Sequence, residues 1–313
     1  MTEVVVVGSL TIDLTANCTE MPGAGETVLG TDFAMVPGGK GNNQAIGSAR
    51  LGAATAMVGR VGQDEFGDRV LGQLAADGVD ATRVERSAAL PTGIAHIRVD
   101  RGGQNSIVMV PLANSEMDEA TVVRHASAIT SARVLLTQLE IPLEATRAAL
   151  RVAKAGGVIT VLNPAPAAPL DPATLAMVDV LVPNEFEASS LTGEAVDSVE
   201  GAVRAARRLL SLGCGSVIVT LGERGAVHVD ARGVLTVAAL PVTAVDTVAA
   251  GDAFCAGLVA ALAAGEPREA ALGRATAAGA LATTLAGATT SLPTKAAVDR
   301  LLLESGGPVI TSV

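Results

Sequence analysis

Continuous runs of β-branched residues alternate with helical patterns along most of this chain. The runs lie at 3–8, 134–139, 157–163, 178–184 and 216–222, and the helical patterns between them lie at 41–52, 65–77, 143–155 and 198–211. Apolar runs without alternation are typical of strands that are buried on both faces. The pattern predicts an α/β fold with a central, mainly parallel β-sheet that is flanked by helices on both faces.

Two regions interrupt this alternation. Residues 13–36 are strand-like and rich in turns, and residues 93–111 read as a hairpin around a Gly pair. Neither region has a neighbouring helical pattern to pack on, so we expect them to form a small separate sheet. Residues 250–303 are Ala-rich and predominantly helical in pattern. We expect a single large domain over 1–313.

Composition limits the ligands and the location of the protein. The chain has no Trp or Tyr and four Phe, so its core must be aliphatic. A net charge of −10 with scattered basic residues argues against a nucleic-acid partner. The three cysteines show neither metal nor disulfide spacing, which favours a reducing, cytoplasmic location. We expect no signal peptide and no membrane span, because no apolar stretch reaches the required length.

The segment DTVAAGDAF (246–254) combines two carboxylates with a run of small residues at the start of a helical pattern. The first amides of a helix have no partner within the helix and attract anions, and small side chains let a phosphate reach them. Ala249, Ala250 and Gly251 would supply that surface. Asp252 would then accept a proton from an attacking alcohol. The alternative is that Asp252 only stabilises the helix N-terminus.

A second segment, PGGKGNNQA (37–45), concentrates glycines and polar side chains. Its glycines permit positive φ and a close approach of the backbone. It is neither a Walker A loop nor a dinucleotide-binding fingerprint. A flexible loop that caps the next helix explains the glycines, but it explains Lys40, Asn42, Asn43 and Gln44 less well. Such donors and acceptors suit a polyol.

Both segments, with others in the same order, resemble the ribokinase-like sugar and nucleoside kinases. The stretches that carry the resemblance are VGSLTIDL (7–14), PGAGETV (22–28), GGKGNNQA (38–45), TQLEIP (137–142), LNPAPA (162–167), PNEFEASSLTG (183–193), TLGERGA (220–226) and DTVAAGDAFCAG (246–257). The resemblance covers essentially the whole chain. It implies ATP-dependent phosphorylation of a primary hydroxyl, with D-ribose converted to D-ribose 5-phosphate as the first expectation. It also implies a lid at about 13–36 and 93–111, and a homodimer through that lid.

The resemblance also assigns roles to individual residues. It makes Asp252 the catalytic base and places the anion hole at the amides of Ala249, Ala250, Gly251 and Asp252. The implied sugar contacts are Thr11, Asp13, Gly39, Lys40, Asn43, Glu140 and Asp252. The implied residues around ATP and Mg²⁺ are Asn184, Glu187, Thr220, Gly222, Glu223, Gly225, Gly251 and Thr276. The implied site for an activating K⁺ comprises Asp246, Val248, Ala282, Leu285, Gly287 and Ser291.

Three positions leave the acceptor open. Thr11 stands where ribokinase-like sugar kinases usually carry Asn, and Leu112 stands where they usually carry Gly. Met109 lies on the predicted lid. A kinase of another sugar or of a nucleoside is therefore an alternative, and neutral drift within one specificity is the other explanation. A sugar-binding protein without turnover is a third hypothesis that no residue favours.

Overall fold

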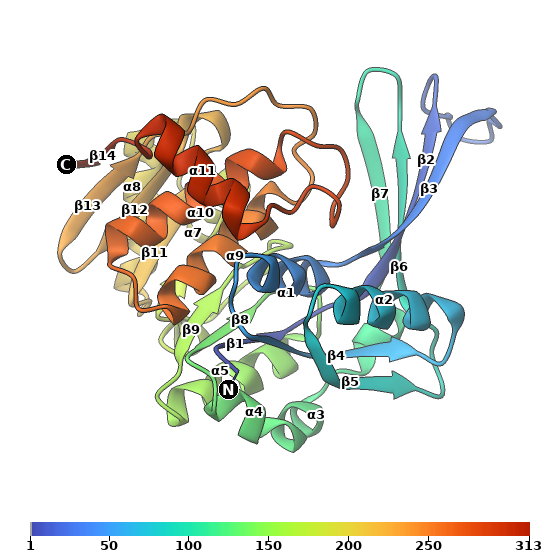
Figure 1. Ribbon diagram of the computed structural model, residues 1–313, viewed down its shortest axis with the longest axis horizontal. Coiled ribbons are helices and arrows are strands. Elements are labelled where there is room, and N and C mark those ends of the chain that lie inside the picture. The colour runs from blue at the N-terminus through green and yellow to red at the C-terminus, as the bar shows by residue number, and fades with distance from the viewer. Residues whose placement is uncertain (1) are drawn as a thin grey trace.

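The computed structural model describes residues 2–313, and a large sheet forms its centre (Figure 1). The order in this sheet is β14-β13-β12-β11-β10-β9-β8-β1-β4-β5. Its strands are β1 (Val4–Val7), β4 (Thr55–Gly62), β5 (Asp80–Ser87), β8 (Val134–Thr137), β9 (Ile159–Leu162), β10 (Val180–Leu181), β11 (Ser216–Thr220), β12 (Ala226–Asp230), β13 (Gly233–Val237) and β14 (Ile310–Ser312). The pairings from β5 to β11 are parallel, and the β12–β14 edge is antiparallel.

The mainly parallel sheet confirms the predicted fold class, and its central strand shows why the sequence folds this way. All four valines of β1 are fully buried, because β4 and β8 pair on its two sides and helices cover both faces. The sequence pattern did not indicate β4, β5 or the antiparallel edge. β5 carries the polar sequence DATRVERS, which suits the outermost strand of the sheet but hides its strand character.

Two apolar layers lie on opposite faces of the large sheet. One is formed with α1 (Lys40–Arg50), α2 (Glu65–Ala76), α9 (Ala250–Ala263), α10 (Arg268–Ala282) and α11 (Lys295–Ser305). The other is formed with α3 (Glu119–Arg124), α4 (Ala126–Thr130), α5 (Leu143–Ala155), α6 (Pro172–Leu175), α7 (Glu185–Thr192) and α8 (Val199–Ser211). Both layers are almost entirely aliphatic, as the composition required. A side chain on Gly257 would press against α10, so small residues allow α9 and α10 to pack closely.

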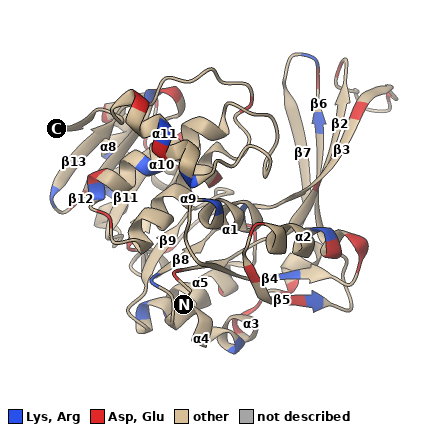
Figure 2. Cartoon of the chain, viewed as in Figure 1, with Lys and Arg blue, Asp and Glu red and all other residues tan. Residues whose placement is uncertain are grey.

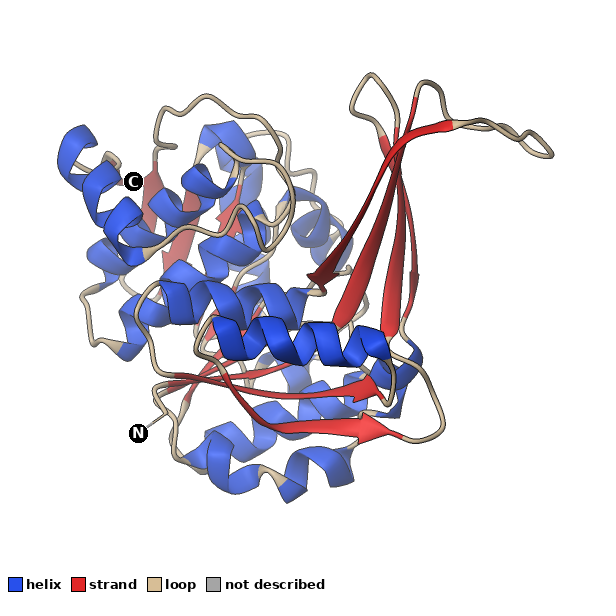
Figure 3. Cartoon of the chain, turned by 45° about the vertical axis from the view of Figure 1, so that its right-hand side comes forward, coloured by secondary structure: helices blue, strands red, loops and turns tan. Residues whose placement is uncertain are grey.

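A small second sheet projects from one end of the large one (Figures 1 and 3). Its order is β3-β2-β6-β7, formed by β2 (Thr11–Cys18), β3 (Gly30–Gly38), β6 (Gly93–Val99) and β7 (Asn105–Val110). These strands come from the two regions that interrupt the helix–strand alternation, as predicted. Register places Val36 and Ala95 on either side of Asp13, with Met109 beyond Ala95. Asp13 therefore lies in a mainly apolar row.

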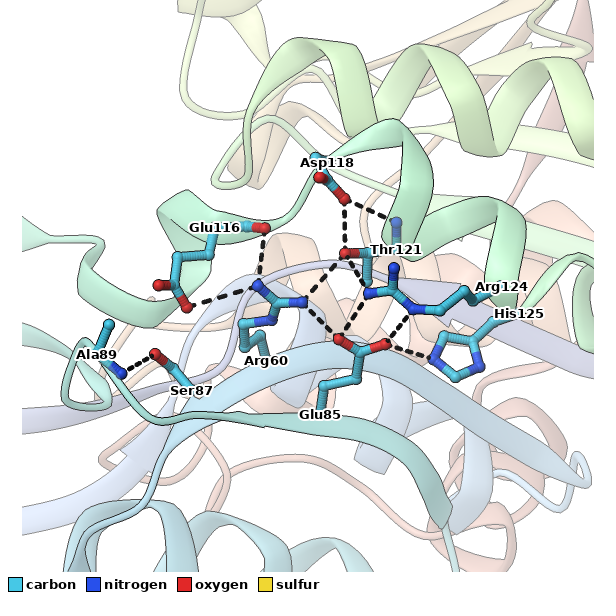
Figure 4. A network of polar contacts seen from close by, with 9 residues as sticks. All are labelled: Arg60, Glu85, Ser87, Ala89, Glu116, Asp118, Thr121, Arg124 and His125. Atoms are coloured by element: carbon cyan, nitrogen blue, oxygen red, sulfur yellow. Dashed lines mark hydrogen bonds and ion pairs between the residues drawn. The ribbon is translucent and has the colours of Figure 1, made fainter.

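A polar network attaches the root of the small sheet to the large one (Figure 4). Arg60 on β4 donates to the backbone oxygen of Glu116 (3.0 Å) in the 3-10 turn η1 (Leu112–Glu116), and it also contacts Glu85 on β5. Asn114 in the same turn accepts from the Leu10 backbone N–H (2.9 Å) and donates to the Leu10 carbonyl (2.8 Å). The turn after β7 thereby fixes the chain just before β2.

Leu112, the first residue of that turn, has a left-handed backbone with φ 48°. Glycine adopts this conformation freely, whereas in other residues it costs about 1–2 kcal/mol. We expect Leu112→Gly to raise the free energy of unfolding by about 0.5–1 kcal/mol, after the greater flexibility of glycine in the unfolded chain is subtracted. Urea unfolding would measure this. Leu112→Ala keeps the strain and should not stabilise, and a Gly variant less stable than wild type would contradict the prediction.

Lys and Arg are interspersed with Asp and Glu over both sheets (Figure 2). Within residues 2–313, no helix has the length and apolar character needed to cross a lipid bilayer.

Candidate active site

A cavity of about 200 Å³ opens at the carboxyl ends of β9, β10 and β11, where ligands commonly bind in sheets of this type. Residues from the loops after these strands meet the first turns of α1, α7 and α9 there. The cavity is lined by Lys40, Asn163, Ala165, Val182, Asn184, Glu187, Thr220, Thr247, Ala249, Gly251, Asp252 and Cys255. Seven of these are residues that the sequence analysis assigned to the site: Lys40, Asn184, Glu187, Thr220, Ala249, Gly251 and Asp252.

The N-terminus of α9 forms one wall of this cavity. Ala249 precedes the helix in a left-handed conformation (φ 60°), and no side chain among residues 2–313 caps this end. The first amides of α9 therefore lack an intrahelical partner, and the exposed Gly251 leaves room for an anion beside them. Asp252 lies in the first turn of α9, 6% exposed. The helix begins where the sequence predicted.

Two side chains of α1 hold the Asp252 carboxylate. Asn43 Nδ2 donates to Asp252 Oδ2 (3.0 Å), and Gln44 Nε2 donates to Asp252 Oδ1 (2.9 Å). Asp252 therefore points toward α1 and the cavity rather than into the apolar core. Buried carboxylates are costly unless they are hydrogen-bonded in this way.

The residues predicted to contact the sugar continue from α1 toward the small sheet. Glu140 accepts from Ser9 Oγ (2.5 Å) and from the Lys40 backbone N–H (2.9 Å), and Thr11 Oγ1 donates to Asp13 Oδ1 (3.2 Å). Burial raises the pKa of Asp13 to about 6 and also raises the pKa of Glu140. The negative charge of Asp252 is the main cause of a raised pKa of Lys40, and the negative charge of Glu140 adds to it. Lys40 is therefore a cation among carboxylates.

Glycines make this close arrangement possible. Gly39 has φ 90° and precedes α1, and a Cβ there would lie 3.1 Å from backbone atoms of Ser9 and Thr11. A Cβ on Gly38 would overlap the Asp13 carboxylate, and one on Gly41 would lie 2.6 Å from the Ser9 backbone. The glycines of this segment thus bring α1 against the strand ends, which is more than a flexible loop requires.

The residues predicted around ATP lie on the other side of the cavity. Asn184 and Glu187 form a reciprocal capping box at the start of α7, and burial raises the pKa of Glu187. The backbone of Asn184 forms an isolated parallel β-bridge with Thr220 at the end of β11. Gly222 and Glu223 follow in the 3-10 turn Gly222–Arg224, and Gly225 comes directly after it; none of the three lines the cavity. Thr276 is buried on α10, its hydroxyl has no protein partner within residues 2–313, and it does not line the cavity either.

Comparison with known proteins identifies the kind of enzyme that has this site. Residues 1–295 match the model of the pfkB family carbohydrate kinases. The ribokinase of Haemophilus influenzae is 38% identical over 93% of this chain and 95% of its own length. The chain belongs to the pfkB family of carbohydrate kinases. The deoxyribokinase of Salmonella typhi is 37% identical over 80% of this chain and 83% of its own length. A solved structure of Arabidopsis thaliana ribokinase complexed with ribose and ATP has a TM-score of 0.91 and 32% identity, covering 96% of this chain and 99% of that one.

Only part of the predicted cation set comes together directly in this pfkB family kinase. The Asp246 carboxylate accepts from the backbone N–H of Val248 (3.0 Å) and of Gly287 (2.9 Å). Ala282, Leu285 and Ser291 lie at the end of α10 and in the loop after it, without a hydrogen bond to Asp246 among the described residues. Across residues 2–313, no group of three or more His, Cys, Asp or Glu side chains is arranged to hold a metal ion.

Two further polar residues lie at the site: Asn163, which the sequence analysis did not name, and Gln44, which it named only as part of the polar cluster that suits a polyol. Gln44 contacts Asp252 directly, and Asn163, after β9, lines the cavity and accepts from Gln44 Nε2 (3.2 Å). Their signals were present in the sequence. Gln44 follows Asn43 in the polar cluster, and Asn163 ends a buried strand, where ligand-binding residues of parallel sheets concentrate.

Proposed function

We propose that this carbohydrate kinase transfers the terminal phosphoryl group of ATP to the primary hydroxyl of D-ribose, forming D-ribose 5-phosphate. The observation that carries the proposal is the buried Asp252 carboxylate at the uncapped end of α9, inside a cavity that also contains Lys40. The ribokinase relatives, and the ribokinase structure complexed with ribose and ATP, support ribose as the acceptor.

In this proposal the residues that line the cavity and those around it have separate roles. Asp252 takes the proton from the attacking hydroxyl, and general bases of this kind contribute typically about 10²–10⁴-fold to the rate. The amides of α9 and the Lys40 ammonium stabilise the negative charge of the phosphoryl group during transfer. Asp13, Asn43 and Glu140 orient the sugar. Thr220 and the turn through Gly222, Glu223 and Gly225 hold the nucleotide, with Thr276 near its base.

We also propose Mg²⁺ and K⁺ as cofactors. The carboxylates of Glu187 and Asp252 are already hydrogen-bonded to protein donors. This donor set fits Mg²⁺ held largely through water and ATP oxygens, which is the usual way this ion binds at phosphate sites. Mg²⁺ would neutralise phosphate charge there. The Asp246 loop would hold an activating K⁺ together with Val248, Ala282, Leu285, Gly287 and Ser291, several of them through backbone carbonyls.

The small sheet is proposed to act as a lid and as the contact of a homodimer. Its strands carry exposed apolar side chains, with Phe33 on β3 and Ile107 and Val108 on β7 all more than half exposed. Closure over the sugar would exclude water and limit ATP hydrolysis. We further propose a cytoplasmic enzyme, which the three free cysteines support.

A 2-deoxypentose is a second candidate acceptor. The Thr11 hydroxyl donates to Asp13 within the protein, so it is less available for a sugar hydroxyl than the Asn usual at this position. A sugar without the hydroxyl that would face Thr11 leaves no polar group unpaired there, so it would lose less binding free energy than ribose in such a pocket. The deoxyribokinase relative supports this alternative.

An ADP-release assay over D-ribose, 2-deoxy-D-ribose, hexoses and nucleosides tests the proposal. We expect D-ribose to give the highest kcat/KM. A higher kcat/KM for 2-deoxy-D-ribose, a hexose or a nucleoside would show that ribose is not the preferred acceptor, while phosphoryl transfer from ATP would still stand. Sugar binding in calorimetry without ADP formation would refute kinase activity altogether.

A further inference from the structure

Gln44 and Gln138 are buried behind Asp252, and the proposed chemistry gives them no role. Both side chains are fully buried. Gln138 lies just after β8, at the same strand ends as the cavity, and its Nε2 donates to Gln44 Oε1 (2.6 Å). Gln44 Nε2 in turn donates to Asp252 Oδ1. An uninterrupted chain of amide hydrogen bonds thus runs from Gln138 to the proposed base.

This chain has only one consistent direction. The oxygen and nitrogen of a glutamine amide have nearly the same shape, so neighbouring groups decide which of the two faces a given partner. Gln138 supplies a donor to the Gln44 oxygen. Asn163 presents its oxygen to Gln44, because its own amide nitrogen donates to the Val182 carbonyl (2.9 Å). The Gln44 nitrogen therefore must face Asp252.

The fold does not need a glutamine at position 138. Gln138 Oε1 is buried and has no hydrogen-bond partner among the described residues. A buried unpaired oxygen costs roughly 1–3 kcal/mol. Gly8 leaves room for it, since a Cβ at that position would overlap this oxygen. Methionine has a similar length and would fill the space without an unpaired polar atom. Gln138 therefore lowers the stability of the fold relative to a methionine, which indicates that it has a role in function.

We propose that Gln138 is a positioning residue for phosphoryl transfer, which acts through Gln44 on Asp252. By fixing the Gln44 amide, it keeps one carboxylate oxygen held by Gln44 while Asn43 holds the other. The carboxylate plane is thereby set toward the acceptor hydroxyl. The inference rests on the proposed kinase function.

A double-mutant cycle tests it, with kcat measured by ADP release on the best acceptor. We expect Gln44→Met to lower kcat about 100-fold and Gln138→Met to lower it about 10-fold, because small displacements of a catalytic group have effects of this size. The double variant should be no slower than Gln44→Met, since Gln138 has no route to Asp252 without Gln44. The sugar Kd from calorimetry should change less than about 3-fold, because neither residue is proposed to contact the sugar.

Matched variants separate this role from a structural one. Gln73→Met is the matched control. Gln73 lies in α2 and also donates to a carboxylate, that of Asp77 at the end of this helix, so its substitution should leave kcat unchanged. If Gln44→Met fails to fold, Gln44→Glu keeps the length and the acceptor for Gln138 but places a second carboxyl group against Asp252. The two groups would share a proton, which makes Asp252 a poorer base, and kcat should again fall. Additive losses in the double variant, or an unchanged kcat in Gln138→Met, would overturn the inference alone. A wild-type protein that phosphorylates no sugar would overturn the proposed function and this inference together.

Discussion

Replacing Asp252 with Asn should lower kcat by about 10²–10⁴-fold while the protein still binds the sugar. The amide cannot accept a proton from the acceptor hydroxyl. In addition, Asn43 and Gln44 each donate to one oxygen of Asp252, so the new NH₂ group must face a donor in either orientation. Coupled ADP release would measure kcat, and calorimetry would measure the sugar Kd, which should rise less than about 10-fold.

Asp171→Asn is the matched control for this experiment. Asp171 is an exposed acidic residue at the N-cap of α6, where it accepts from the Thr174 backbone N–H. Because Asn also caps helices well, Asp171→Asn should lower the free energy of unfolding by only about 0.5 kcal/mol, and it should not change kcat. If Asp252 only stabilised the N-terminus of α9, the two variants would behave alike. Near-normal turnover by the Asp252 variant would therefore remove the base assignment.

Replacing Asp13 with Asn should weaken sugar binding and stabilise the protein at the same time. Hydrogen bonds to a charged acceptor contribute about 1.5–3 kcal/mol, so we expect the sugar Kd to rise roughly 10- to 100-fold. Burial raises the pKa of Asp13 from an ordinary 3.8 to about 6 in the folded protein. Above pH 6 the folded state therefore holds an unfavourable buried charge that the unfolded chain solvates. The variant should be about 2 kcal/mol more stable at pH 7.5, after allowance for partial exposure.

The pH dependence of stability distinguishes the expected effect of Asp13→Asn from a general stabilisation. Between about pH 4 and pH 6 the folded wild type binds a proton that the unfolded chain has released, so its penalty from Asp13 grows as the pH rises through this window. The stability difference between Asp13→Asn and wild type should accordingly vanish below pH 4. Chemical unfolding at several pH values would measure it. Asp32→Asn, on the exposed part of β3, should change neither stability nor sugar binding. A wild type more stable than Asp13→Asn at pH 7.5 would contradict the prediction.

The sequence by itself determined the layered α/β core, the small sheet and the two segments, 37–45 and 246–254, whose residues line the cavity. These features have local signals. The valines of β1 form a continuous apolar run, and the small residues before Asp252 directly precede a helical pattern. The strands β4 and β5 and the antiparallel edge were missed, because arginines, glutamates and glycines within or between them weaken the local apolar pattern.

Only the tertiary structure decided which side chains share the site. Asn43 and Asp252 are 209 residues apart in the chain, yet their side chains are hydrogen-bonded. The roles of Gln44, Gln138 and Asn163 depend on which amide atom faces which neighbour, and no local pattern encodes that choice. Leu112 likewise reads as an ordinary apolar residue until its backbone is seen at positive φ. Contacts between distant segments arise when helices pack on the sheet, so the spacing of residues along the chain cannot specify them.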